Sequence, residues 1–175
     1  KDNENGARMA IDELNAKGVT IGGKKAKFEL VAEDDAGDPK RGTAVANKLV
    51  DAKVNGVIGH LNSGTSIPAS KVYSDAGIPQ ISPANTAVGL TTNKPGASPG
   101  EPQKYYPTGK RTYTRIVPID TIQGAAMVSL MKQNGCTKLA EVNDKEVYGQ
   151  GIAKNVELAA KSAGGKCTNP KADAR

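Results

Sequence analysis

The feature that most constrains the fold is a regular alternation of short apolar runs with longer segments of helical periodicity. The apolar runs predict strands at residues 27–32, 54–59, 78–82, 113–117 and 139–142, with a further strand beginning at 166–168. The segments between them predict helices over residues 2–17, from 39 past 50, 68–76, 121–134 and 149–163. Such alternation indicates parallel sheets covered by helices on both faces. We therefore expect an α/β fold with Rossmann-like topology.

Local signals mark the ends of several predicted helices. Glycine follows the periodic stretch at Gly18, Gly77, Gly135 and Gly164, where its freedom to adopt a left-handed backbone ends a helix. Asp38 followed by Pro39 is typical of an N-cap with proline in the first helical position. The stretch from 91 to 110 is rich in proline and glycine, which predicts a long surface loop inside the first unit.

Composition excludes several classes of protein. The chain has 175 residues, 37% of them apolar, which is enough for a core, and it contains no apolar run near the ~18 residues that a membrane span needs. Its net charge of +6 arises from 24 basic residues spread among 18 acidic ones, with only five Tyr and one Phe to stack on bases. We expect a soluble protein that does not bind nucleic acid.

Two clusters of small polar residues follow neighbouring predicted strands. Ser63 to Ser66 come after the strand at 54–59, and Ser82 to Thr86 come at the end of the strand at 78–82. Ligands of open parallel sheets bind where strands turn into helices. The first cluster, before a helix, suits an anion, whereas the Ala84 carbonyl and Thr86 hydroxyl suit an ammonium. A zwitterion such as a free amino acid would satisfy both.

Plainer interpretations remain open for the same residues. The Ser/Thr cluster also fits an ordinary helix cap. His60 is more simply a packed histidine than a general base, because no acid is suitably spaced and no nucleophile-elbow motif surrounds Ser63. The acidic residues of the turn at 33–38 fit solvated loop charges and one N-cap. No spacing typical of a metal site or a cofactor-binding loop is present, so we expect neither metal nor cofactor.

Several motifs in register resemble one known family. GHLNSGTSIPAS followed by GIPQISPANT is similar to the ligand-binding core of the periplasmic branched-chain amino-acid binding proteins, and the resemblance extends to NGARMAIDELNAKG, AEDDAGDPKRGTAVANKLV and VNDKEVYGQG. It implies a two-lobed receptor that closes on one amino acid. The implied division is a first lobe over 1–118, lacking its first strand, and the start of a second lobe over 119–175. The chain is thus expected to be a fragment that would not fold or bind alone.

The resemblance also implies roles for particular residues. Leu61, Asn62 and Ser63 match positions that hold the ligand's carboxylate and side chain, Ala84 and Thr86 match positions that hold its carboxylate and ammonium, and Tyr148 matches the second lobe's contribution. Relatives often carry a pair of cysteines in the turns that read DDAGDP and HLNS here. Gly37 and Asn62 replace both, and the Asn62 amide puts a purely aliphatic specificity in doubt. The loop over 94–110 is also longer than expected for the family.

The implied function is that of an extracytoplasmic solute-binding protein. It would capture an amino acid, with the branched-chain Leu, Ile and Val expected, and deliver it to an ABC transporter permease as a periplasmic or membrane-tethered extracellular monomer without enzymatic activity. Two alternatives stay open: a hydrolase that uses Ser63 and His60, and a ligand-sensing receptor domain of the same fold. Cys136 and Cys167 lie beside the two strands of a predicted β-α-β crossover, which predicts a disulfide between them.

Overall fold

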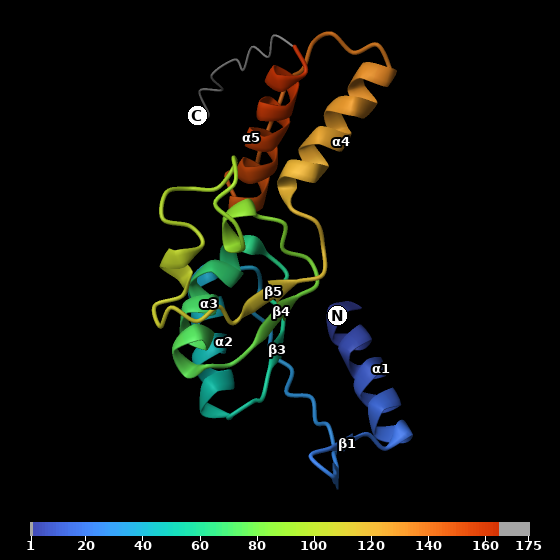
Figure 1. Ribbon diagram of the computed structural model, residues 1–175, viewed down its shortest axis with the longest axis vertical. Coiled ribbons are helices and arrows are strands. Elements are labelled where there is room, and N and C mark those ends of the chain that lie inside the picture. The colour runs from blue at the N-terminus through green and yellow to red at the C-terminus, as the bar shows by residue number, and fades with distance from the viewer. Residues whose placement is uncertain (1, 165–175) are drawn as a thin grey trace.

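The computed structural model describes residues 2–164 (Figure 1). The helices are α1 (Asp2–Lys17), α2 (Pro39–Asp51), α3 (Ser63–Ala76), α4 (Asp120–Gln133) and α5 (Val147–Ser162), with 3₁₀ turns η1 (Val88–Leu90) and η2 (Gln103–Tyr105). The strands are β1 (Thr20–Ile21), β2 (Lys24–Lys25), β3 (Val57–Ile58), β4 (Gln80–Ser82) and β5 (Tyr113–Arg115). Among the described residues, no helix combines the length and apolar character needed to span a membrane.

A three-stranded parallel sheet in the order β3-β4-β5 organises the larger part of the molecule. Ile58 pairs with Ile81, and Ile81 pairs with Thr114. Parallel neighbours require crossover connections, and here α3 joins β3 to β4. The parallel sheet with its helical crossover confirms the predicted α/β class. We call β3, β4 and β5 together with α2 and α3 the sheet unit.

Helices α2 and α3 pack together on one side of the sheet, while α1 stands clear on the other side (Figure 1). Their shared core consists of buried apolar side chains, namely Val45, Ala46, Leu49, Ala69, Tyr73 and Ile78. The helices approach closely at Gly42, where an added Cβ would lie 3.3 Å from the Thr65 Cβ. Helix α1 buries none of its residues, so its predicted apolar stripe has no partner surface in the described chain.

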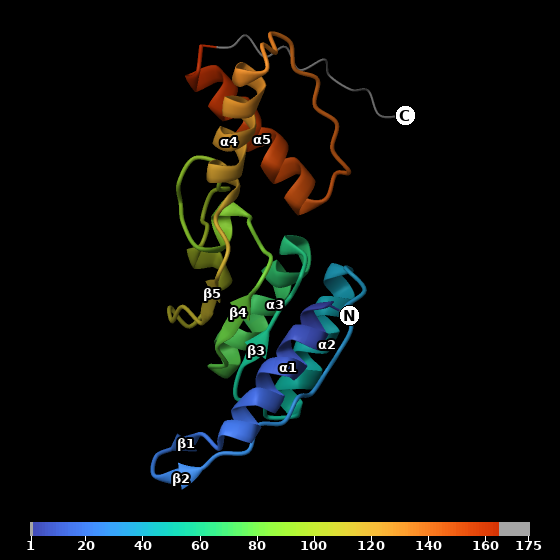
Figure 2. The same ribbon diagram turned by 90° about the vertical axis from the view of Figure 1, so that its right-hand side faces the viewer.

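Helices α4 and α5 run parallel to each other beyond the carboxyl ends of the strands, with their first turns joined by Gln123 and Tyr148 and their last turns by Lys132 and Ala163 (Figures 1 and 2). Val128, Val156 and Ala160 make the buried centre of this helix pair. At Gly124 an added Cβ would lie 2.7 Å from the main-chain carbon of Asn155, so only glycine permits this approach. We call α4 and α5 the helix pair.

The predicted helix ends are confirmed where a local signal marks them. Helix α1 spans the expected residues and ends at Gly18, which has a φ of 71°. The Asp38 carboxylate accepts a hydrogen bond from the Arg41 N–H at 2.7 Å, so it is the N-cap of α2. Gly77 closes α3 in the left-handed conformation with a φ of 70°.

Two predicted strands are wrong and a third is untested. Residues 27–32 and 139–142 have no strand structure. A strand exists only when its N–H and C=O groups pair with a neighbour, and no described segment lies alongside either stretch in a ladder. Val142 is accordingly 97% exposed. The strand expected at 166–168 lies outside the described residues, as does Cys167, while Cys136 is exposed.

The glycine-rich and proline-rich stretches both adopt defined structure. Gly22 and Gly23, with φ of 57° and 78°, form the tight turn of the β1-β2 hairpin, which the sequence analysis did not anticipate. The loop over 91–110 is more than a surface loop, because Tyr105 and Tyr106 are buried with Tyr113 in a core of their own. The Tyr106 hydroxyl donates to the Leu90 carbonyl at 2.8 Å.

Candidate functional site

The two polar clusters meet at the carboxyl edge of the sheet, as predicted. The first cluster leads from β3 into α3, and the second leaves β4. The Ala87 N–H donates to the Ser63 hydroxyl oxygen at 3.4 Å, which joins the turns directly. The Ser82 hydroxyl donates to the His60 carbonyl at 3.0 Å beneath them. The two strand ends thus form one continuous polar surface.

Helix α3 begins at Ser63, five residues before the predicted start at Pro68, which lies inside the helix. Asn62 is the N-cap residue, but its side chain makes no capping bond; its main-chain carbonyl accepts from the Thr65 N–H at 3.2 Å and the Ser66 N–H at 3.1 Å. Within residues 2–164 the N–H groups of Ser63 and Gly64 make no hydrogen bond. The first turn of a helix with unpaired N–H groups attracts an anion.

The second turn brings a hydroxyl and a carboxylate together. The Asp120 N–H donates to the Thr86 carbonyl at 2.9 Å, so the start of α4 is fixed to this turn. The Thr86 Oγ1 and both carboxylate oxygens of Asp120 are buried, and the Thr86 hydroxyl lies beside that carboxylate. Burial raises the pKa of the Asp120 carboxyl, while the nearby Thr86 hydroxyl and Arg115 guanidinium oppose that rise. Ala84, two residues before Thr86 in the same turn, is half-buried.

The helix pair borders the same surface from the other side. An added Cβ on Gly64 would lie 3.5 Å from a Val147 methyl carbon, so the first turns of α3 and α5 are in contact. An added Cβ on Gly151 would lie 3.0 Å from the Asp120 Oδ2. Tyr148, which the sequence analysis assigned to this border, is 42% exposed. Its hydroxyl accepts from the Gln123 amide at 3.0 Å, a contact within the helix pair.

The remaining predicted site residues are exposed. Leu61 is 57% exposed, and Asn62 is also exposed. An added Cβ on Gly37 would lie 3.6 Å from the Asn62 Oδ1, so the acidic turn and the HLNS turn are adjacent. This adjacency agrees with the paired-cysteine positions that the family resemblance implied.

His60 belongs to a buried network that the sequence analysis did not detect. Its Nδ1 lies 2.6 Å from the Asp35 carboxylate and its Nε2 lies 3.2 Å from the Tyr73 hydroxyl. The expectation that no acid partners His60 was therefore wrong, and so was the description of Asp35 as a solvated loop charge. Burial and the Asp35 charge raise the pKa of Tyr73, which holds that hydroxyl neutral. Neither ring nitrogen of His60 is bonded to Ser63, which removes the geometric basis of the hydrolase alternative.

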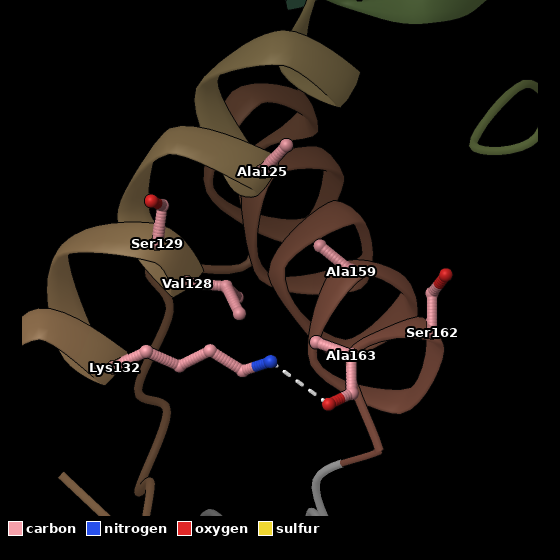
Figure 3. A pocket seen from close by; sticks show the side chains of 7 residues that line it. All are labelled: Ala125, Val128, Ser129, Lys132, Ala159, Ser162 and Ala163. Carbon is pink, nitrogen blue, oxygen red and sulfur yellow. Dashed lines mark hydrogen bonds between the residues drawn. The ribbon is translucent and has the colours of Figure 1, made fainter. Parts of the chain in front are cut away.

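A separate groove lies between α4 and α5 (Figure 3). It is lined by small and basic side chains, namely Ala125, Val128, Ser129, Lys132, Ala159, Ser162 and Ala163. Figure 3 shows the Lys132 ammonium reaching across it to the Ala163 carbonyl, a bond of 2.9 Å. None of the candidate site residues lines this groove, so it is distinct from the polar surface at the sheet edge.

The α/β sheet unit, the polar turns at its edge and the helix pair beyond them define a class of protein. The chain matches the family described as periplasmic binding protein over residues 1–173, and it belongs to that family. It is 38% identical over 153 residues to the Leu/Ile/Val-binding protein of Escherichia coli, covering 87% of this chain and 37% of that relative. It is 35% identical over 160 residues to the leucine-, isoleucine-, valine-, threonine- and alanine-binding protein of Pseudomonas aeruginosa, covering 91% of this chain and 38% of the relative.

Solved structures agree with these relatives. The branched-chain amino acid transporter substrate-binding protein of Streptococcus pneumoniae, in complex with isoleucine, aligns with a TM-score of 0.73 at 26% identity and covers 97% of this chain. A substrate-binding protein of Desulfitobacterium hafniense in complex with Leu aligns with a TM-score of 0.69 at 28% identity and covers 93%. The chain spans 45% and 43% of those two proteins, less than half of each.

Proposed function

We propose that this protein is an extracytoplasmic solute receptor that binds a branched-chain amino acid and presents it to an ABC transporter permease. One observation carries the proposal. The first turn of α3, whose N–H groups suit an anion, lies at the same edge of the sheet as the buried Thr86 hydroxyl and the Asp120 carboxylate. The names of the relatives support the ligand class. We propose that residues 1–118 form one lobe and that residues from 119 onward begin the other.

The ligand carboxylate would bind at the first turn of α3. The unpaired N–H groups of Ser63 and Gly64 and the positive end of the helix dipole favour an anion there. The Ser63 hydroxyl accepts from the Ala87 N–H, and its own hydrogen is free to point to that anion. Leu61 and Asn62, which flank this turn, would contact the ligand side chain.

The ammonium would bind at the second turn, where the Ala84 carbonyl and the Thr86 hydroxyl provide acceptors. Its position beside the carboxylate site follows from the contact between Ala87 and Ser63. An α-amino acid carries its two charges on neighbouring groups. Two adjacent subsites, one that prefers an anion and one that prefers a cation, therefore match it.

Closure of the two lobes on the ligand supplies the transport signal. The contact of Gly64 with Val147 supports a place for the start of α5 beside the proposed carboxylate subsite. Tyr148, next to Val147, would complete the site from the second lobe. A closed liganded form differs in shape from the open one, and a permease can recognise that difference. The receptor itself performs no chemistry in this proposal, and we expect it to act as a periplasmic or membrane-tethered monomer.

Calorimetry of the full-length protein with L-leucine, L-isoleucine and L-valine tests the proposal. Ser63→Ala and Thr86→Val should each weaken binding by about 1–3 kcal/mol, because each removes a hydrogen bond to a charged group. Ser162→Ala and Thr114→Val are matched controls on exposed positions and should bind as the wild type does. Absence of binding to all three amino acids by the wild type would refute the proposal.

A further inference from the structure

The loop over residues 91–110 has no part in the proposed function, yet it is packed firmly against the sheet unit. Its buried Tyr105 shares a core with Tyr113 of β5. The Glu101 carboxylate occupies the space that a side chain at Gly89 of η1 would need, so the loop and η1 are in close contact. These contacts fix the base of the loop to the part of the chain that carries the two polar turns.

One turn of this loop reaches the helix pair. Figures 1 and 2 show the loop, in green to yellow, between the sheet unit and the helix pair. The Ala97 N–H donates to the Lys94 carbonyl at 3.0 Å, which closes a tight turn around Pro95 and Gly96. The Thr121 hydroxyl of α4 lies 3.5 Å from the Pro95 carbonyl oxygen. A loop that is fixed to the sheet unit therefore touches the helix pair through this turn.

Gly96 is enclosed on both sides by the two units. An added Cβ at this position would lie 2.7 Å from the Asn155 Oδ1 of α5 and 3.1 Å from a methyl carbon of Val88 in η1. Gly96 also has a φ of 104°, in the region of backbone space that favours glycine. The main chain of the loop thus fills the space between η1 and α5 and leaves no room for a side chain.

The Asn155 side chain is held in place and cannot easily move aside. It is buried, its Nδ2 donates to the Gly151 carbonyl at 2.8 Å, and its Oδ1 accepts from the Thr121 hydroxyl at 3.1 Å. Displacing the amide would break both bonds and leave buried polar atoms without partners, which is costly. A fixed main chain at Gly96 therefore meets a fixed amide at Asn155.

We infer that Gly96 and Asn155 are positioning residues, which set the angle between the sheet unit and the helix pair and thereby the affinity for the amino acid. The inference rests on the proposed function and adds to it a contact that lies outside the ligand site. The arrangement in which Gly96 meets Asn155 is also the one in which Gly64 meets Val147 beside the proposed carboxylate subsite. Separating Gly96 from Asn155 should therefore depopulate the form that holds the ligand from both sides, and the apparent affinity falls with that population.

Four variants of the full-length protein separate this role from a merely structural one. Gly96→Ala places a methyl group against the Asn155 amide. Gly109→Ala is the matched control, because residue 109 lies in the same loop with a φ of 73° and an added Cβ there has nothing within 4 Å. Asn155→Ala removes the amide, and the variant that combines Gly96→Ala with Asn155→Ala gives the new methyl group room.

The measurements are calorimetry with L-leucine and small-angle scattering of the ligand-free proteins. We expect Gly96→Ala to bind L-leucine about tenfold more weakly than the wild type and to have a larger radius of gyration without ligand. Asn155→Ala, which loses the same contact, should weaken binding about threefold or more. The combined variant should bind no more weakly than Asn155→Ala alone, because the contact through which the methyl group acts is gone. Gly109→Ala should bind and scatter as the wild type does.

The outcomes distinguish this inference from the proposed function. Wild-type affinity together with a wild-type scattering profile in Gly96→Ala overturns the positioning role and leaves the receptor function standing. An equal loss of affinity from Gly96→Ala with and without the Asn155 amide also overturns it, because the methyl group would then act elsewhere in the loop. If Gly96→Ala does not fold, the comparison of Asn155→Ala with the wild type decides in the same way.

Failure of the receptor function has a different signature. If the wild type binds none of the three branched-chain amino acids, that function fails, and scattering of the ligand-free proteins decides the positioning role alone. A larger radius of gyration for Gly96→Ala than for Gly109→Ala supports it, and equal radii overturn it.

Discussion

The side-chain amide of Asn85 donates a hydrogen bond of 2.7 Å to the main-chain carbonyl of Leu61, across the boundary between the two polar turns. The same amide donates to the His60 carbonyl at 3.0 Å, and its own carbonyl accepts from the Tyr113 hydroxyl at 3.0 Å. One buried side chain therefore connects the loops that follow β3 and β4 and fastens both to β5. The relative positions of the proposed subsites depend on it.

Asn85→Ala should lower the free energy of unfolding by about 1–3 kcal/mol, because two carbonyls and one hydroxyl lose their partner inside the protein. Asn85→Asp keeps an acceptor for Tyr113 but donates nothing, so it should not restore stability. Urea unfolding measures both, with the exposed Asn55→Ala as a control. If Asn85→Ala unfolds at the wild-type midpoint, the turns are held by other contacts.

Gly124→Ala should separate the helix pair. The added methyl group would lie within 3.0 Å of three main-chain atoms of Asn155 and Val156, which cannot move aside as a side chain can. Overpacking of this kind costs about 1–3 kcal/mol. Gly6→Ala, in a helix with nothing within 4 Å, should instead gain about 0.5–1 kcal/mol from helix propensity. Thermal unfolding that ranks the two variants in the opposite order would contradict the observed packing.

Stability should fall as the pH rises above the ordinary range of tyrosine ionisation. Burial raises the pKa of Tyr113 to about 12 from a usual value of 10.0, so the folded state keeps this hydroxyl neutral where the unfolded chain ionises. The stabilisation is fully present below pH 10.0 and is lost between there and about 12. When the free energy of unfolding is measured by urea titration across that pH interval, it should fall less steeply with pH for Tyr113→Phe than for the wild type. An equal slope in both proteins would mean that folding does not protect the Tyr113 hydroxyl from ionisation.

A cross-link should form between the acidic turn and the HLNS turn when cysteines are placed at both positions. An added Cβ on Gly37 would lie 3.9 Å from the Asn62 Cγ, so cysteines at the two positions would be neighbours, and a rotation of the side chain at position 62 would bring the sulfurs together. We expect the variant that combines Gly37→Cys with Asn62→Cys to oxidise in air and to lose two free thiols by alkylation and mass spectrometry. Its stability gain will be reduced by the left-handed backbone at residue 37, where φ is 70°.

The proposed disulfide between Cys136 and Cys167 stays a prediction, since Cys167 lies outside the described residues. If it forms, the loop that it closes should stabilise the full-length protein by about 3 kcal/mol in the chain-entropy model. Alkylation of the unfolded, non-reduced protein decides the matter, and two modified thiols there would show that the bridge is absent.

Local chemistry allowed the helices and the polar turns to be predicted from sequence. Each end signal acts locally: Asp38 accepts a hydrogen bond through its carboxylate, and Pro39, Gly18 and Gly77 act through their backbone preferences. The structure therefore confirms the ends that they mark. Pro68 misled the prediction, because proline was expected to open a helix that already begins at Ser63. The segment 27–32 has strand-like residues, yet strand structure depends on a neighbour that no local pattern can supply.

The missed parts of the site share a different cause. Asp35 and His60 are 25 positions apart, and Asn85 contacts residues 24 and 25 positions before it. Asp120 reads in the sequence as an ordinary acid at a helix start, where negative charge is common. Only its complete burial marks it as unusual, and burial is a property of the packed chain.

The first turns of α3 and α5 are in contact at Gly64 and Val147, so the positive ends of two helix dipoles approach one another. If the protein closes on its ligand as proposed, their mutual repulsion should oppose closure of the empty form, and any small anion held between them should reduce that repulsion. The open and closed populations of the free protein should therefore depend on which buffer salt is present. Scattering profiles in sulfate and in chloride at equal ionic strength would differ before any amino acid is added, and this background must be subtracted when the closure produced by the ligand is measured.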